Sequence, residues 1–188
     1  MVGVGKRKRD GLARVSIVDY HGKVLYNKYV KPKVPITDYR TRWSGIMPHH
    51  MKGAVSFKQA RTETLKIIKD KIVVGHALHH DFKVLKINRN TCNVRDTSHC
   101  LQLRQLAGFP RNQTPSLRKL ASAVLQRDIQ VRTHCSIEDS STAMLLYKAV
   151  RMEWEEGGKH GNEESNLGTS KSYLGDNFWP DWLNLGTS

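Results

Sequence analysis

Two alternating segments joined by a short turn constrain the fold of this 188-residue chain more than any other feature. Residues 12–19 and 23–30 are rich in β-branched and aromatic side chains, and residues 20–22 separate them, which predicts a β-hairpin. Downstream, helical spacing over residues 56–68 gives way to a short apolar run over 72–74, which is typical of a buried strand. A hairpin followed by alternating helices and strands favours an α/β or α+β fold with a mixed sheet.

The rest of the chain continues this alternation and then changes character. Further elements are expected as helices over residues 80–85, 115–126 and 136–156, a strand over 92–96 and an irregular stretch over 31–51. From residue 157 onward Gly, Asn, Ser and Thr dominate, and the pentapeptide NLGTS occurs twice. We therefore expect one domain over residues 1–156 and a mostly disordered, acidic, low-complexity tail over 157–188. The FWPDW run at 178–182 either docks a protein partner or folds back onto the domain.

Charge is distributed unevenly between these two parts. The net charge of +14 is the sum of +19 over residues 1–152 and −5 over residues 153–188. A body this basic favours a polyanionic partner, of which nucleic acid is the commonest. A ribosome-associated or simply soluble basic domain is the alternative.

Hydropathy and cysteine usage exclude several other classes of protein. No run of about 18 apolar residues suits a transmembrane helix, and the first residues lack the apolar segment of a secretory signal. The three cysteines lack CxxC spacing, which argues against a disulfide framework and against a structural zinc site. We therefore expect a reducing compartment and no membrane partner.

The first candidate site follows the apolar run that ends at Gly75. His76, His79, His80 and Asp81 lie together where a strand is expected to give way to a helix, and ligand sites of α/β proteins lie at such junctions. Three histidines beside an aspartate suggest zinc, but there is no HExxH pattern and no nearby cysteine pair. The alternative is structural: Asp81 caps the helix and His76 is a hydrogen-bonded core histidine.

The second candidate site surrounds the start of the last predicted helix. His134 lies just before it, and Glu138 and Asp139 lie in its first turn, where the helix dipole alone favours a carboxylate. A histidine beside a carboxylate also places a base next to a ligand for a hard divalent cation, as phosphodiester hydrolysis requires. Cys135 suggests a thiol nucleophile, but no oxyanion element or third partner accompanies it.

Two basic segments supply candidate nucleic-acid contacts. Arg40 and Arg42 are interleaved with Tyr39 and Trp43 in a non-periodic loop, and arginines grip phosphates while aromatic rings stack on bases. The alternative is a surface loop anchored by its aromatic residues. The basic run at residues 6–9 is a nuclear localisation signal, a phosphate-binding arm or a solvated turn.

Taken in order, five segments resemble a known family. They read LARVSIVDYHGKVLYNKYVKP, ITDYRTRWSGI, KIVVGHALHHDF, RDTSH and HCSIEDSSTAMLLY. They are similar to the DEDDh 3′-to-5′ exonucleases of the RNase H-like superfamily, and most similar to its interferon-stimulated and apoptosis-enhancing group. The resemblance covers residues 1–156.

The resemblance implies a role for individual residues. Asp81 matches the second exonuclease motif, and His134 and Asp139 match the third. In that family the two aspartates hold divalent cations, Mg²⁺ or Mn²⁺, and the histidine is the general base. Arg40 matches an arginine that contacts the sugar of the terminal nucleotide, and Met1 matches a methionine on its other side. We add Arg42, from the same loop, as a further substrate-binding candidate.

The chain departs from the family at its start. There the first motif, Asp-x-Glu, lies on a central strand and immediately precedes the methionine that Met1 matches. Asp10 and Asp19 are the only acids within residues 1–20, and they lack that spacing. We therefore expect an RNase H-like mixed sheet flanked by helices but lacking its first central strand, with reduced stability and a compromised two-metal site.

Two functions are consistent with these observations. The first is a metal-dependent 3′-to-5′ exonuclease domain acting on RNA or single-stranded DNA, of which this sequence is a fragment. The second is a short product that binds single-stranded nucleic acid without cutting it. The resemblance implies residence in the nucleus or nucleolus, with the cytoplasm as an alternative.

Overall fold

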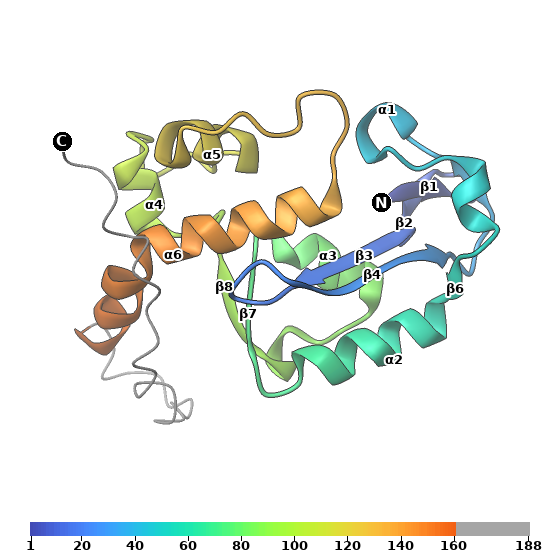
Figure 1. The fold of residues 1–188 in the computed structure, drawn as a ribbon, viewed down its shortest axis with the longest axis horizontal. Coiled ribbons are helices and arrows are strands. Elements are labelled where there is room, and N and C mark those ends of the chain that lie inside the picture. The colour runs from blue at the N-terminus through green and yellow to red at the C-terminus, as the bar shows by residue number, and fades with distance from the viewer. Residues whose placement is uncertain (161–188) are drawn as a thin grey trace.

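The computed structural model describes residues 1–160, in which three small β-sheets pack among helices (Figure 1). In chain order the elements are β1 (Val2–Val4), β2 (Arg9–Gly11), β3 (Arg14–Val18), β4 (Val24–Lys31), β5 (Ile36–Asp38), α1 (Thr41–Ser44), the 3-10 helix η1 (Pro48–Met51), β6 (Val55–Ser56), α2 (Phe57–Ile68), β7 (Ile72–Gly75), α3 (Leu78–Leu85), the 3-10 helix η2 (Arg89–Thr91), β8 (Asn93–Asp96), α4 (Leu101–Leu106), α5 (Leu117–Leu125) and α6 (Ser136–His160). None of these helices is long and apolar enough to span a bilayer.

The β3–β4 hairpin predicted from the sequence is confirmed. The two strands pair antiparallel, with Val15 opposite Lys28 and Ile17 opposite Tyr26. Alternation places Val15, Tyr26 and Val30 in the core, where they meet Ala60 and Ile68 of α2. Helix α2 begins where the Ser56 hydroxyl accepts a hydrogen bond from the Gln59 amide, and its span agrees with the helix predicted over residues 56–68. In Figure 1, α2 covers one side of the hairpin and α6 the other.

The βαβ unit formed by β7, α3 and β8 is also as predicted. β7 and β8 pair in parallel from Ile72–Asn93 to Gly75–Asp96, which requires the crossover through α3. Strand β7 ends at Gly75, where a larger residue would not fit. The side chain of Leu78 occupies the space that a Cβ would need, because an added Cβ would lie 2.4 Å from a Leu78 methyl carbon. The first turn of α3 is thereby drawn against the end of β7.

A second core lies among the last three helices. Leu103 of α4, Leu120 of α5 and Leu146 of α6 are fully buried against one another. Helix α6 also packs on β3 and β7, so it joins this helical layer to both sheets. It continues to His160, beyond the end near residue 156 that the sequence predicts. The predicted tail and its FWPDW run lie outside the described residues from 161 onward.

The sequence prediction missed the N-terminal sheet. β1 pairs with β2 and β5, and its Val2 is buried with Ala13 and Ile46. The basic run at residues 6–9 forms the exposed turn between β1 and β2 and the start of β2. The stretch over 31–51 is also more ordered than predicted, because β5, α1 and η1 lie within it.

An apolar cavity separates β3 from β7. Its volume is about 1190 Å³, and its wall includes residues from both strands and from α3 and α6. Within residues 1–160 no strand joins β3 to β7: β3 pairs only with β4, and β7 only with β8. This arrangement agrees with the prediction of a mixed α/β fold that lacks a central strand.

The carboxylate of Glu63 on α2 should make stability depend on pH. Hydrogen bonds from Gln59, Tyr26 and Lys28 lower its pKa to about 2 in the folded protein. A folded pKa below the unfolded value contributes stability above about pH 4.5 that is lost as the pH falls towards 2. Glu63→Gln should therefore be less stable than the parent chain at neutral pH, and the difference should shrink between about pH 5 and pH 2.

Urea unfolding at a series of pH values measures this difference. Asp128→Asn removes an exposed carboxylate after α5 and serves as the matched control. A stability difference for Glu63→Gln that is constant across the acidic range would contradict the assignment.

Candidate active site

Three predicted site residues line the same cavity. Asp81 comes from the first turn of α3, His134 from the loop before α6, and Asp139 from the first turn of α6. All three contribute to the cavity wall, as do Met1 and Arg40. The wall of one cavity thus includes the three predicted catalytic residues and two of the three predicted substrate contacts.

Asp81 lies in a poorly hydrated position. Burial raises the pKa of its carboxyl to about 6, although the nearby N-terminal amine and His80 favour the charged form. Desolvation of a carboxylate that faces a cavity is typical of groups that bind a cation or transfer a proton.

The start of α3 is capped by Asp96 rather than by Asp81. Asp96 Oδ1 accepts a hydrogen bond of 2.8 Å from the Ala77 amide, and Oδ2 accepts one of 2.8 Å from the Leu78 amide. The structural alternative for Asp81, that it caps the helix, is therefore wrong. The corresponding alternative for His76 is correct, because His76 Nδ1 lies 3.0 Å from the hydroxyl of Thr97.

His134 and Asp139 form a pair at the start of α6. His134 Nδ1 lies 3.7 Å from Asp139 Oδ2, and the side-chain Nε2 of Gln130 donates a 2.7 Å hydrogen bond to Asp139 Oδ1. Burial raises the pKa of the Asp139 carboxyl, while Gln130 and His134 oppose the shift. Thus Nδ1 of the imidazole faces the carboxylate. The ring is half-exposed, so its Nε2 can bind another group.

The loop after β5 lies directly against His134. The His134 amide donates a 2.8 Å hydrogen bond to the Trp43 carbonyl, and an added Cβ on Gly45 would lie 3.4 Å from the Thr133 hydroxyl. Gly45 ends α1 with a φ of 65°, a conformation that glycine adopts without the strain of a side chain. This close approach places the aromatic and basic loop at the mouth of the cavity.

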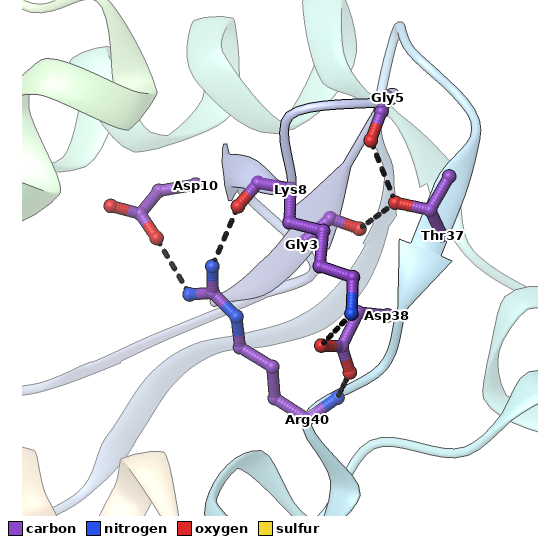
Figure 2. Close-up of polar contacts among 7 residues, drawn as sticks. All are labelled: Gly3, Gly5, Lys8, Asp10, Thr37, Asp38 and Arg40. Atoms are coloured by element: carbon purple, nitrogen blue, oxygen red, sulfur yellow. Dashed lines mark hydrogen bonds and ion pairs between the residues drawn. The ribbon is translucent and has the colours of Figure 1, made fainter.

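Arg40 is held by the N-terminal hairpin (Figure 2). Its guanidinium donates to Asp10 Oδ1 at 2.6 Å and to the Lys8 carbonyl at 2.8 Å, while its backbone amide donates to Asp38. Arg42, by contrast, is exposed on α1 and is not part of the cavity wall. Of the two predicted arginines, only Arg40 lies at the site.

The N-terminal amine of Met1 is an unpredicted member of the site. Burial lowers its pKa, and the charge of Asp81 opposes that shift while Arg40 adds to it.

Sequence reasoning missed Asp96 and Gln130. Asp96 had a detectable signal, since an aspartate followed by Thr97 and Ser98 after a strand is typical of a turn or cap. Gln130 had none, because only the folded arrangement brings this loop residue to Asp139.

Comparison with known proteins assigns the chain to a family. Residues 3–147 match the family model RNase_T, described as Exonuclease. The chain belongs to this exonuclease family. It is 44% identical to the human apoptosis-enhancing nuclease over 100% of this chain and 61% of that protein. It is 51% identical to the human interferon-stimulated 20 kDa exonuclease-like 2 over 83% of this chain and 45% of that protein.

The fold agrees with this assignment. The catalytic unit of Neurospora crassa Pan2, which contains a protease and a nuclease domain, superposes with a TM-score of 0.64 at 33% identity, over 80% of this chain and 26% of that one. The chain thus spans less than two thirds of the length of the curated relatives named above.

Gly45→Ala should test the left-handed backbone conformation at the end of α1. A side chain at this left-handed φ costs about 1–2 kcal/mol, so the melting temperature should fall. Gly53→Ala is the control, because an added Cβ there meets nothing within 4 Å and its φ is not positive. Thermal melting of both variants measures the effect, and equal melting temperatures would contradict a strained Gly45.

Proposed function

We propose that this chain carries the substrate-binding and proton-accepting half of a metal-dependent 3′-to-5′ exonuclease site for RNA or single-stranded DNA. The convergence of Asp81, His134 and Asp139 on one cavity carries the proposal. The basic charge of residues 1–152 supports a polyanionic substrate. One solved Pan2 neighbour from Saccharomyces cerevisiae is described in complex with A7 RNA, which supports a single-stranded substrate.

The two aspartates suit a hard divalent cation. Carboxylate oxygens are the ligands that Mg²⁺ and Mn²⁺ prefer, and Mg²⁺ is commonly held by one or two carboxylates together with substrate phosphates. Asp81 and Asp139 are both desolvated, so a cation would offset the cost of keeping them charged. When bound, such a cation polarises the scissile phosphate.

His134 is proposed as the general base. Its Nδ1 faces Asp139, which orients the ring. The other nitrogen is then the one that accepts a proton from the attacking water. Gln130 is a positioning residue, because it holds the Asp139 carboxylate from the other side.

Arg40 and Met1 are proposed to hold the terminal nucleotide. Arg40 must exchange its bond to Asp10 for a substrate group, and the exposed Trp43 beside it offers a face for a base. Arg42 is proposed as a more distant phosphate contact.

The basic charge of residues 1–152 is also consistent with a second function, a module that binds nucleic acid without cutting it. Among the described residues, the cavity wall carries the carboxylates of Asp19, Asp81 and Asp139, of which Asp81 and Asp139 are the candidate metal ligands. This function would use the basic surface and the loop that carries Arg40 and Trp43, and it would not include hydrolysis.

A strand-extended chain separates the two functions. We would fuse an apolar strand ending in Asp-x-Glu ahead of Met1, with a length that matches the five residues of β3. This strand should fill the cavity, raise the melting temperature and permit stepwise shortening of a labelled oligonucleotide with Mg²⁺ or Mn²⁺. Asp139→Asn in the extended chain should abolish shortening with little effect on melting.

The matched control carries Asn-x-Gln in place of Asp-x-Glu in the same added strand. This control should melt at the same temperature as the extended chain, because its added strand packs in the same way. It should leave the oligonucleotide intact, because it lacks the two added carboxylates. If the Asp-x-Glu chain melts cooperatively at the higher temperature but is also inert, the exonuclease proposal is wrong and the binding function is preferred.

The exposed basic turn should contribute to nucleic-acid affinity. Because Arg40 is bonded to the Lys8 carbonyl, this turn lies beside the proposed substrate end. Replacing Lys6 and Arg7 by Ala should weaken binding and reduce the dependence of log K on log salt by about 0.7 for each lost phosphate contact. Fluorescence anisotropy across a salt series measures this change.

A control for this experiment removes the same charge elsewhere. Arg118→Ala with Lys119→Ala alters two exposed cations on α5 and should leave the slope close to that of the parent chain. Identical losses in both double variants would indicate a general charge effect rather than a binding turn. The exposed turn also supports our proposal of nuclear residence, since import signals are basic runs of this kind.

A further inference from the structure

The histidines near Asp81 are not all used by the proposed exonuclease site. His76 is committed to Thr97, and His80 lies against His79 with ring centroids 3.9 Å apart. His79 instead groups with Asp96 and His99, and one ligand atom from each of these three residues lies within 4.8 Å of the others. The sequence had placed these histidines beside Asp81, whereas the fold gives His79 a different carboxylate.

Asp96 is the fixed member of this group. Its Oδ1 accepts hydrogen bonds from the Ala77 amide and from the amide and hydroxyl of Ser98. Its Oδ2 accepts one hydrogen bond, from Leu78, and so keeps a lone pair for another partner. Although burial disfavours its charged form, the hydrogen bonds from Ser98, Ala77 and Leu78 hold the pKa of Asp96 below its ordinary value. The carboxylate is thus oriented and ionised.

The two histidines approach this carboxylate from different elements. His79 lies in the first turn of α3, and His99 lies in the turn between β8 and α4, where its amide donates to the Asp96 carbonyl. Both side chains are exposed, so their rings can rotate without disturbing the core. A tetrahedral site with bonds of about 2.0–2.1 Å needs ligand atoms about 3.3 Å apart, so the ligand atoms would have to close by at most roughly 1.5 Å.

We propose that His79, His99 and Asp96 form a second metal site that binds a transition-metal dication such as Zn²⁺. Two imidazole nitrogens and one carboxylate oxygen are a ligand set for Zn²⁺, with a fourth position for water or an anion, whereas Mg²⁺ prefers oxygen ligands and octahedral geometry. The site is separate from the cavity, because neither His79 nor His99 contributes to the cavity wall that includes Asp81.

A metal ion at this position would join two segments that carry the exonuclease site. It would tie the first turn of α3, which presents Asp81, to the turn after β8. The Asp96 bonds to Ala77 and Leu78 already make this connection, and the ion would strengthen it through side chains alone. The expected consequence is a folded state that is stabilised by zinc at low concentration.

Calorimetric titration with ZnCl₂ in excess Mg²⁺ tests the proposal, because Mg²⁺ occupies carboxylate sites but competes poorly for imidazole. The unaltered chain should bind one zinc ion, and this binding should depend on both His79 and His99. His79→Gln or His99→Gln should each weaken that binding at least about tenfold, since loss of a supporting residue alone costs this much. His99→Cys should bind zinc more tightly than His99→Gln, because a thiolate is a zinc ligand.

His49→Gln is the matched control. His49 is also an exposed histidine beside a second one, with ring centroids 4.1 Å apart, but no carboxylate joins that pair in a metal-binding group among the described residues. Its affinity for zinc should equal that of the parent chain. Zinc binding that survives both His79→Gln and His99→Gln, or that falls equally in His49→Gln, would overturn the proposal. The readout uses no nuclease activity, so its result is independent of the proposed function.

Discussion

The carboxylate of Asp96 is the connection on which the rest of the structure depends. Asp96 is the last residue of β8, and its carboxylate accepts backbone hydrogen bonds from Ala77 and Leu78 at the start of α3. One side chain thus joins a strand to the helix beside it. Ala77 adopts a φ of 55°, an uncommon conformation for a residue with a side chain, and its amide is among those that Asp96 holds. Asp81 follows within the same turn, so its position at the cavity derives from this cap.

The second constraint is electrostatic. A divalent cation site normally gathers negative charge, but this cavity wall carries Arg40 as well as Asp81 and Asp139. Asp10 forms a hydrogen-bonded ion pair with Arg40, so the charge of this guanidinium is offset within the protein. A phosphate group of a nucleic acid would compete with Asp10 for the same guanidinium.

Sequence patterns predicted those parts of the molecule in which local chemistry and burial agree. The β3–β4 hairpin, α2 and β7 have clear periodicity, and their cores contain the expected apolar residues. The N-terminal sheet was missed because Gly3 and Gly5 weaken any strand signal and a basic turn dominates the segment. The short helix α4 lacked a cap that sequence could reveal, since the Cys100 side chain makes no capping bond. At the site, the sequence motifs predicted Asp81, His134 and Asp139 as candidate catalytic residues. The sequence could not separate Arg40 from Arg42, because hydrogen bonds to the N-terminal hairpin hold Arg40 at the cavity.

The backbone hydrogen bond from His134 to Trp43 has a mechanical consequence. It connects the segment that carries Arg40, the proposed sugar contact, to the residue whose imidazole is the proposed base. Under the proposed function, a terminus that displaced α1 would therefore also displace the ring from Asp139. Poor fit of the nucleotide would then weaken binding and proton transfer together.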